Sequence, residues 1–160
     1  MRTTPRSFFH LFVEPNFEDY LQEAHDVRRG MNAAVSAFQM ADIFYAFYSR
    51  ENRSVITQWP KPKDLIKHLC DLEPSFLTVQ SVATVYKHLY AREGFYEVNS
   101  PGAVWGVQIP GEKIELESDF QDGRVDILVR RRDNSVVSLT NALRRVVNDM
   151  WPAFLPEEAA

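Results

Sequence analysis

The sequence predicts a mainly α-helical protein of the α+β class, a helical bundle with a small antiparallel β-meander inserted before the last helix. Three observations carry this prediction. Apolar residues recur every three or four positions over long stretches, as in amphipathic helices. Beyond residue 94 short alternating segments follow, separated by turn residues. A helical pattern then returns near the C-terminus. We expect one domain over residues 1–160, with a helical part at 17–92, a meander at about 103–139 and a closing helix at about 140–152.

The first helices are predicted from caps and periodicity. NFEDYLQEA predicts a short helix with Asn16, directly after Pro15, as its N-cap. The strongest pattern, HDVRRGMNAAVSAFQMADIFYAFYSR, has Asp26 as its expected N-cap, and Gly30 weakens its first turn without abolishing it. Its expected buried line is Val27, Met31, Ala34, Val35, Phe38, Ala41, Phe44, Tyr45 and Tyr48. A narrow polar line on the same helix is Arg28, Asn32, Ser36, Gln39 and Asp42.

Prolines mark the boundaries of the next two helices. Pro60 and Pro62 predict a loop, because proline is excluded from helix interiors. PKDLIKHLCDL then predicts a short helix that packs through Leu65, Ile66, Leu69 and Leu72. EPSFLTVQSVATVYKHLYARE predicts a long helix with Pro74 in its first turn. Its apolar line is Phe76, Val79, Val82, Ala83, Tyr86 and Leu89 or Tyr90; its other side is Gln80, Ser81, Thr84, Lys87 and His88.

The C-terminal part combines short strands with one more helix. AVWGVQI, KIELES and RVDILVR predict the strands of a meander, RRDNS predicts a turn, and VVSL is a candidate fourth strand. TNALRRVVNDMWPAFL predicts the closing amphipathic helix, whose expected apolar residues are Leu143, Val146, Val147, Met150 and Trp151.

Composition and missing motifs exclude several function classes. The net charge of −4 argues against a general nucleic-acid surface, since only a local basic cluster at residues 130–132 and 144–145 is present. Phosphate-cradling glycine motifs, HExxH, CxxC and GxSxG are absent, so no cofactor and no metal is expected. A single cysteine, Cys70, fits a reducing compartment and is expected to be a buried, inert thiol. FFHLFV is too short for a signal-peptide core and no run is long enough for a membrane span, so we expect a cytoplasmic protein without membrane contact.

Two polar positions on otherwise apolar helices are candidates for a site. Asp42 lies between aromatic neighbours, where an unpaired charge is costly. His88 lies in a helix expected to pack on that of Asp42, so Asp42 is expected to accept a hydrogen bond from His88, Arg28 or Arg29. Such a pair is either a structural contact or an oriented imidazole for acid–base chemistry, and both interpretations stay open.

The pair of segments MNAAVSAFQMADIFYAF and VATVYKHLYAR resembles bacterial proteins of the HEPN-like kind, over roughly residues 17–92 plus the closing helix with Trp151. The resemblance implies a helical bundle and a dimer. Active members of the wider HEPN group are metal-independent ribonucleases, which use an arginine followed four to six residues later by histidine across a dimer interface. The matching histidine is His88, but the arginine positions hold Ser81, Val82 and Ala83, and Thr84 stands where related proteins often have asparagine.

The leading functional hypothesis is therefore a non-catalytic HEPN-like module that forms a homodimer and binds a protein partner, with Asp42, Asn32, Lys87 and Thr84 as candidate binding residues. Phe44, Phe47 and Tyr48 suit either an interface or the core.

The alternative is an HEPN-type ribonuclease in which His88 is catalytic and Arg92, Lys87 or Arg28 supplies positive charge; RNA is a partner only in this case. A ribonuclease predicts His88 exposed in a basic cleft at a dimer interface, whereas a binding module allows it to be buried. A third hypothesis is a small-molecule pocket lined by Trp105 and Tyr96.

Overall fold

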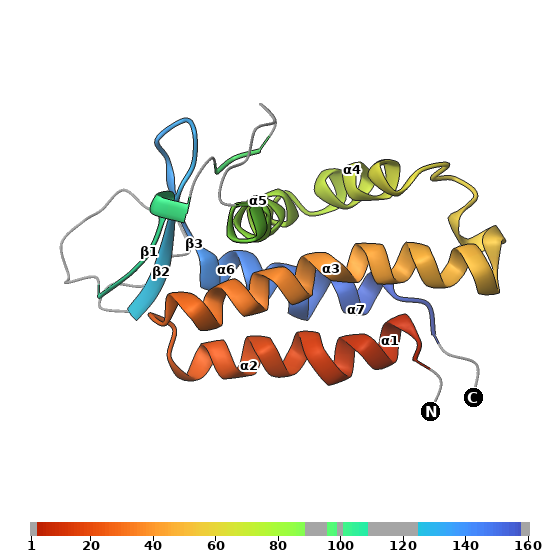
Figure 1. Ribbon diagram of the computed structural model, residues 1–160, viewed down its shortest axis with the longest axis horizontal. Helices are drawn as coiled ribbons and strands as arrows, with labels where there is room; N and C mark the ends of the chain where they lie inside the picture. Colours follow the sequence, from red (N-terminus) through yellow and green to blue (C-terminus); the bar gives the residue numbers. More distant parts are fainter. Residues whose placement is uncertain (1–2, 89–95, 99–100, 109–124, 158–160) are drawn as a thin grey trace.

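The computed structural model describes residues 3–88, 96–98, 101–108 and 125–157. These residues form a helical bundle with a three-stranded antiparallel sheet at one end (Figure 1). Helix α3 lies between α1–α2 on one side and α5 on the other, and α6–α7 lies behind it. The prediction of a mainly α fold, with a small sheet before the last helix, is confirmed. Among the described helices, none is both long and apolar enough to cross a membrane.

The first helical rod begins earlier than the sequence predicted. It combines α1 (Pro5–Phe8), a π-helical stretch (Phe9–Val13) and α2 (Glu14–Gln22). Thr4 is its N-cap: the Thr4 hydroxyl accepts a hydrogen bond from the Ser7 backbone N–H at 3.1 Å. The Ser7 hydroxyl in turn accepts one from the Thr4 N–H at 2.8 Å. This reciprocal pair satisfies two of the backbone donors that a helix start leaves free.

Asn16 therefore lies inside α2, and the prediction that it caps a helix is wrong. Proline normally ends a helix because it lacks an N–H and its ring clashes with the carbonyl one turn earlier. Here the π-helical stretch, which ends at Val13 two residues before Pro15, widens that turn and lets the rod continue. The same combination recurs at Pro152, which directly follows the π-helical stretch Arg145–Met150 and Trp151.

Helix α3 (Val27–Glu51) begins as predicted at Asp26. The Asp26 carboxylate accepts hydrogen bonds from the backbone N–H groups of Arg28 at 2.9 Å and Arg29 at 3.2 Å. These hydrogen bonds hold the pKa of Asp26 below its usual value, and the bond from the Arg29 N–H has the largest effect. Ser36, expected on the polar line, is instead buried and donates to the Ala33 carbonyl.

Gly30 is required where α3 approaches the sheet closely. A Cβ atom at this position would lie 2.5 Å from Cδ1 of Ile127 and 3.2 Å from Cδ2 of Leu139. Both side chains are fully buried, so neither can move into solvent. The glycine thus allows a close contact between α3, the sheet and the closing helix.

We expect Gly30→Ala to lower the free energy of unfolding by about 1–2 kcal/mol, because overpacking outweighs the gain in helix propensity. Urea unfolding measures the change. Ala46→Gly at an exposed position of α3 is the control, with an expected loss of about 1 kcal/mol from propensity alone. A Gly30→Ala variant more stable than wild type would contradict the close-contact interpretation.

A 3-10 turn (Arg53–Ile56) leads to α4 (Pro62–Leu72) and α5 (Ser75–His88), which begin where the prolines predicted. Two expected packing residues point to solvent instead: Leu72 is 55% exposed and Tyr86 is 50% exposed.

The predicted polar side of α5 is partly buried. The Cys70 thiol of α4 donates to Gln80 Oε1 at 3.5 Å, and the Ser81 hydroxyl accepts from the Glu97 backbone N–H at 3.0 Å. Helix α4 and the segment at residues 96–98 therefore cover Gln80 and Ser81, whose hydrogen bonds make this burial tolerable.

The sheet has the order β1 (Val104–Gln108), β2 (Val125–Arg130) and β3 (Val136–Ser138), all antiparallel. In its register Val104 faces Val129, and Leu128 faces Ser138. The predicted RRDNS turn joins β2 to β3, with Asn134 in the left-handed region at φ 68°. The predicted VVSL strand is confirmed as β3, while KIELES lies outside the described residues.

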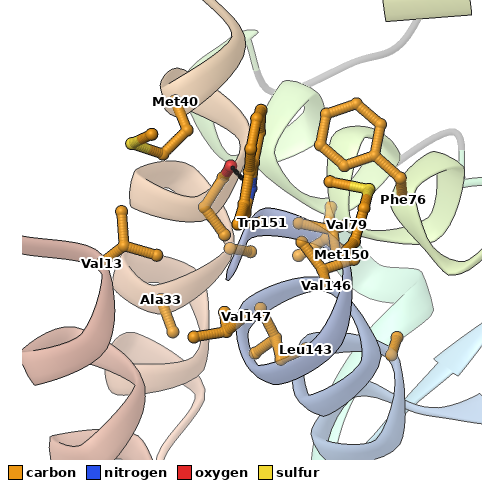
Figure 2. Packing of buried hydrophobic residues seen from close by; sticks show 14 of the residues in the cluster. Val13, Ala33, Met40, Phe76, Val79, Leu143, Val146, Val147, Met150 and Trp151 are labelled. Carbon is orange, nitrogen blue, oxygen red and sulfur yellow. Dashed lines mark hydrogen bonds between the residues drawn. The ribbon is translucent and has the colours of Figure 1, made fainter. Parts of the chain in front are cut away.

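The closing helix packs behind α3 and contacts both α3 and α5. It runs from α6 (Leu139–Arg144) through the π-helical stretch to α7 (Trp151–Phe154), and its apolar side chains fill the space between α3 and α5. Figure 2 shows Trp151 between Met40 of α3 and Phe76 of α5. The indole N–H of Trp151 donates to the Ala37 carbonyl at 3.0 Å.

Candidate functional site

A groove between α3 and α5 brings together most of the predicted site residues. Its volume is about 360 Å³, within the range of ligand-binding clefts. Its apolar lining comes from Val35, Phe38 and Ala83, and its more polar lining consists of Gln39, Asp42, Thr84, Tyr86, Lys87, His88 and Tyr96. Predicted residues on two different helices therefore share one concave surface.

The side chains of Asp42, Lys87 and His88 are exposed at this groove. Thr84 is half-buried, and its hydroxyl donates to the Gln80 carbonyl at 2.8 Å, so it is already engaged within its own helix. The geometry gives the groove an apolar lining with one carboxylate, one ammonium and one imidazole around it.

The predicted hydrogen bond of Asp42 with His88, Arg28 or Arg29 is wrong. Within the described part of the chain, Asp42 is hydrogen-bonded to none of these three residues. The guanidinium groups of Arg28 and Arg29 instead lie 3.4 and 3.5 Å from Oδ2 of Asp26, which is within ion-pair distance. The carboxylate needs no partner inside the protein because its exposed position keeps it hydrated.

His88 is exposed, as the ribonuclease hypothesis requires, but the described groove is not basic. Asp42 and Lys87 contribute opposite charges to its described lining. Arg92, the predicted cation, lies outside the described residues, as does the side chain of Trp105. Tyr96 does line the groove, so one element of the small-molecule hypothesis is present.

Asn32 lines a second groove, on the other side of α3. This groove lies between α1–α2 and α3, has a volume of about 370 Å³ and is lined by Phe8, Phe12, Asn16, Asn32, Val35, Ser36 and Gln39. Val35 and Gln39 belong to both grooves. We call this surface of α1–α2, α3 and α5 the three-helix face.

The first rod contributes to this face in a way that the sequence analysis does not predict. Phe8, Phe12 and Asn16 follow one another at four-residue spacing along the rod, and Phe12 is 49% exposed. The i, i+4, i+8 spacing within FFHLFVEPN was the available signal. The predicted helix start at Asn16 left this segment outside the expected helices.

The aromatic residues considered for an interface lie elsewhere. Phe44 is only 1% exposed and packs against Phe154 and Trp59, with ring centroids 5.1 and 6.4 Å apart. Tyr48 and Phe47 are half-buried beside it. Of the two interpretations left open, the core interpretation is correct for Phe44.

The Cys70 thiol is unsuited to nucleophilic chemistry. Burial raises the pKa of Cys70 to about 11, and the neighbouring carboxylates Asp71 and Glu97 act in the same direction. The thiol therefore stays protonated near neutral pH, whereas a nucleophile needs the thiolate.

A buried polar cluster around Asp126 was not predicted. Its Oδ1 accepts hydrogen bonds from the Thr140 hydroxyl at 2.7 Å and the Tyr20 hydroxyl at 3.3 Å, and its Oδ2 accepts one from the Ser138 hydroxyl. Burial, followed by the charge of Asp126, raises the pKa of Tyr20 far above its usual value. With Asp126 only 1% exposed, this cluster joins α2, β2 and α6 and is structural.

The three-helix face is thus the candidate site. It has two adjoining grooves, half-exposed Phe12 and Tyr86, and few charges, while the other polar clusters described above are satisfied internally. Its interpretation rests on its own residues, because no family model, curated protein or solved structure matches the chain.

Proposed function

We propose that this chain is a non-catalytic, cytoplasmic binding module of the HEPN-like kind that associates with itself through the three-helix face. The supporting observation is the pair of adjoining grooves, about 360 and 370 Å³, on either side of the α3 residues Val35 and Gln39. Cores of protein interfaces are depleted in charge and enriched in aromatic residues. The second groove follows this pattern, since none of the described residues that line it is charged.

Both protruding and recessed features occur on this one face. Single exposed apolar side chains are common on protein surfaces and need no explanation. Here, however, the half-exposed rings of Phe12 and Tyr86 each lie beside a groove of a size that admits such a ring. A two-fold symmetric dimer requires this kind of self-complementary patch, because the same surface supplies both partners.

Sedimentation velocity tests the proposal. At concentrations up to about 100 µM, above the micromolar dissociation constants of weak interfaces, we expect wild type to form dimers. Gln39→Lys places a charge between the two grooves and is expected to shift the protein to monomer. The matched control is Gln58→Lys, an exposed glutamine in the turn before α4. A monomeric wild type, or equal behaviour of the two variants, would overturn the proposal.

The second candidate is the metal-independent ribonuclease, which is favoured by the exposure of His88 at the groove. RNA cleavage needs an acid–base group and a cation that stabilises the developing negative charge. The binding-module proposal agrees better with the balanced charge of the described groove and with Ser81, Val82 and Ala83 at the arginine positions.

We expect His88→Ala to change the free energy of unfolding by less than about 0.5 kcal/mol in urea, as for other exposed positions. Because the variant stays folded, an RNA-cleavage assay can then compare it directly with wild type. Neither protein is expected to cleave RNA. Cleavage by wild type that is lost in His88→Ala would favour the ribonuclease instead.

A further inference from the structure

We propose that the two-fold axis of the dimer passes through the mouth of the α3–α5 groove, so that Asp42 of each copy pairs with Lys87 of the other. This inference rests on the proposed function and specifies its geometry. It comes from the placement of charge on the three-helix face and from the position of Tyr86 beside Lys87.

The charges at the groove are suited to pairing between copies. Asp42 extends from α3 and Lys87 from α5, and both side chains are exposed at the same groove. Apart from His88, they are the charged residues among the described residues that line the two grooves. Within the described residues, no ion pair joins Asp42 to Lys87, so neither is neutralised by the other within one copy.

Symmetry then restricts the arrangement. In a two-fold dimer, an axis near Asp42 brings two carboxylates together, and an axis near Lys87 brings two ammonium groups together. Like charges opposite each other in an interface are strongly unfavourable. An axis between them, at the groove, places each carboxylate opposite an ammonium and forms two equivalent ion pairs.

The same axis gives Tyr86 a role. Its side chain is half-exposed at the groove next to Lys87 in sequence, although the residue was expected in the core. With the grooves face to face, each Tyr86 ring enters the opposite groove, where Val35 and Ala83 supply apolar contact. Tyrosine suits such a position because its ring is apolar and its hydroxyl stays near the polar rim.

A charge exchange between two variants tests the pairing. Asp42→Lys alone and Lys87→Asp alone each create two like-charge contacts, and each is expected to weaken dimerisation about tenfold or more at low salt. Mixing the two variants restores both opposite-charge contacts, so we expect a heterodimer with near wild-type affinity. The double variant Asp42→Lys/Lys87→Asp is expected to form a homodimer again. The control is Lys63→Asp, which makes the same change in charge as Lys87→Asp at an exposed position of α4.

Sedimentation velocity at low and high salt gives the readout, and circular dichroism checks that each variant is folded. Added salt is expected to reduce the difference between wild type and the single variants, because it screens like charges. A dimeric wild type whose single variants dimerise as well as Lys63→Asp, or variants that do not associate when mixed, would overturn the pairing and leave self-association standing. A monomeric wild type would overturn the proposed function itself.

Discussion

Replacing Trp151 by alanine is expected to lower the free energy of unfolding by about 3–5 kcal/mol, the range for deleting a large buried aromatic side chain. Trp151 is fully buried in the closing helix, with its ring centroid 5.9 Å from those of both Phe76 and Phe154. Its loss leaves a cavity among α3, α5 and α7. Urea unfolding followed by circular dichroism measures the change.

Trp151→Phe separates packing from hydrogen bonding. The phenyl ring keeps part of the volume but removes the donor to the Ala37 carbonyl, so we expect a loss of about 1–2 kcal/mol. If the alanine variant lost no more stability than the phenylalanine variant, the Trp151 ring would not fill the buried position described here.

Replacing Asp126 by alanine is expected to lower the free energy of unfolding by about 3 kcal/mol or more. The carboxylate is the shared acceptor of Tyr20, Ser138 and Thr140, all of them buried. Removing it leaves buried hydroxyl groups with fewer acceptors, and each stranded group costs about 1–3 kcal/mol. The Tyr20 and Thr140 hydroxyls can still bond to each other across 2.8 Å, which limits the total loss.

Asp126→Asn is the matched variant for this cluster. Its side-chain carbonyl oxygen can still accept a hydrogen bond from Thr140, and the Ser138 hydroxyl can turn to accept one from the new amide N–H. We therefore expect the free energy of unfolding to fall by only about 1 kcal/mol. Asp149→Ala, at an exposed position, is expected to change stability by less than about 0.5 kcal/mol. Equal losses for Asp126→Ala and Asp149→Ala would refute a structural role for the cluster.

Local chemistry made much of the fold predictable. Asp26 caps α3 because a carboxylate can accept from the free N–H groups of a first turn. The apolar periodicity of the closing helix predicted the burial of Leu143, Val146 and Val147. These signals lie within a few residues of the structure that they specify, so one sequence is sufficient to detect them.

The incorrect or missing predictions concern residues whose environment is determined by segments distant in the sequence. Pro15 signals a helix start locally, but a π turn and tertiary packing carry the helix through it. Ser81 is predicted on the polar side of its helix, but it is buried because the backbone of Glu97 covers it. The buried role of Asp126, within the predicted strand RVDILVR, is not predictable locally, because its partners lie 12 to 106 residues away in the sequence.

The candidate site was predicted in part for the same reason. Asp42 and His88 are predicted as polar positions on apolar helices, and Thr84 and Lys87 as further candidate residues. The structure brings all four to one groove. The hydrogen bond expected of Asp42 depended on the relative rotation of two helices, which periodicity does not determine. The second groove is not predicted, because Phe12 belongs to the part of the first rod that precedes the predicted helix.

The contribution of the last helix to the core has a consequence for biosynthesis. The indole N–H of Trp151 donates a hydrogen bond to the Ala37 carbonyl, and the Arg6 guanidinium donates one to the Leu155 carbonyl at 2.8 Å. These contacts join residues more than a hundred positions apart in the sequence. A nascent chain that ends before Leu139 has synthesised α1 to α5 without the helix that packs between α3 and α5. Its exposed apolar surfaces must then be shielded from aggregation until translation reaches the final residues of the bundle.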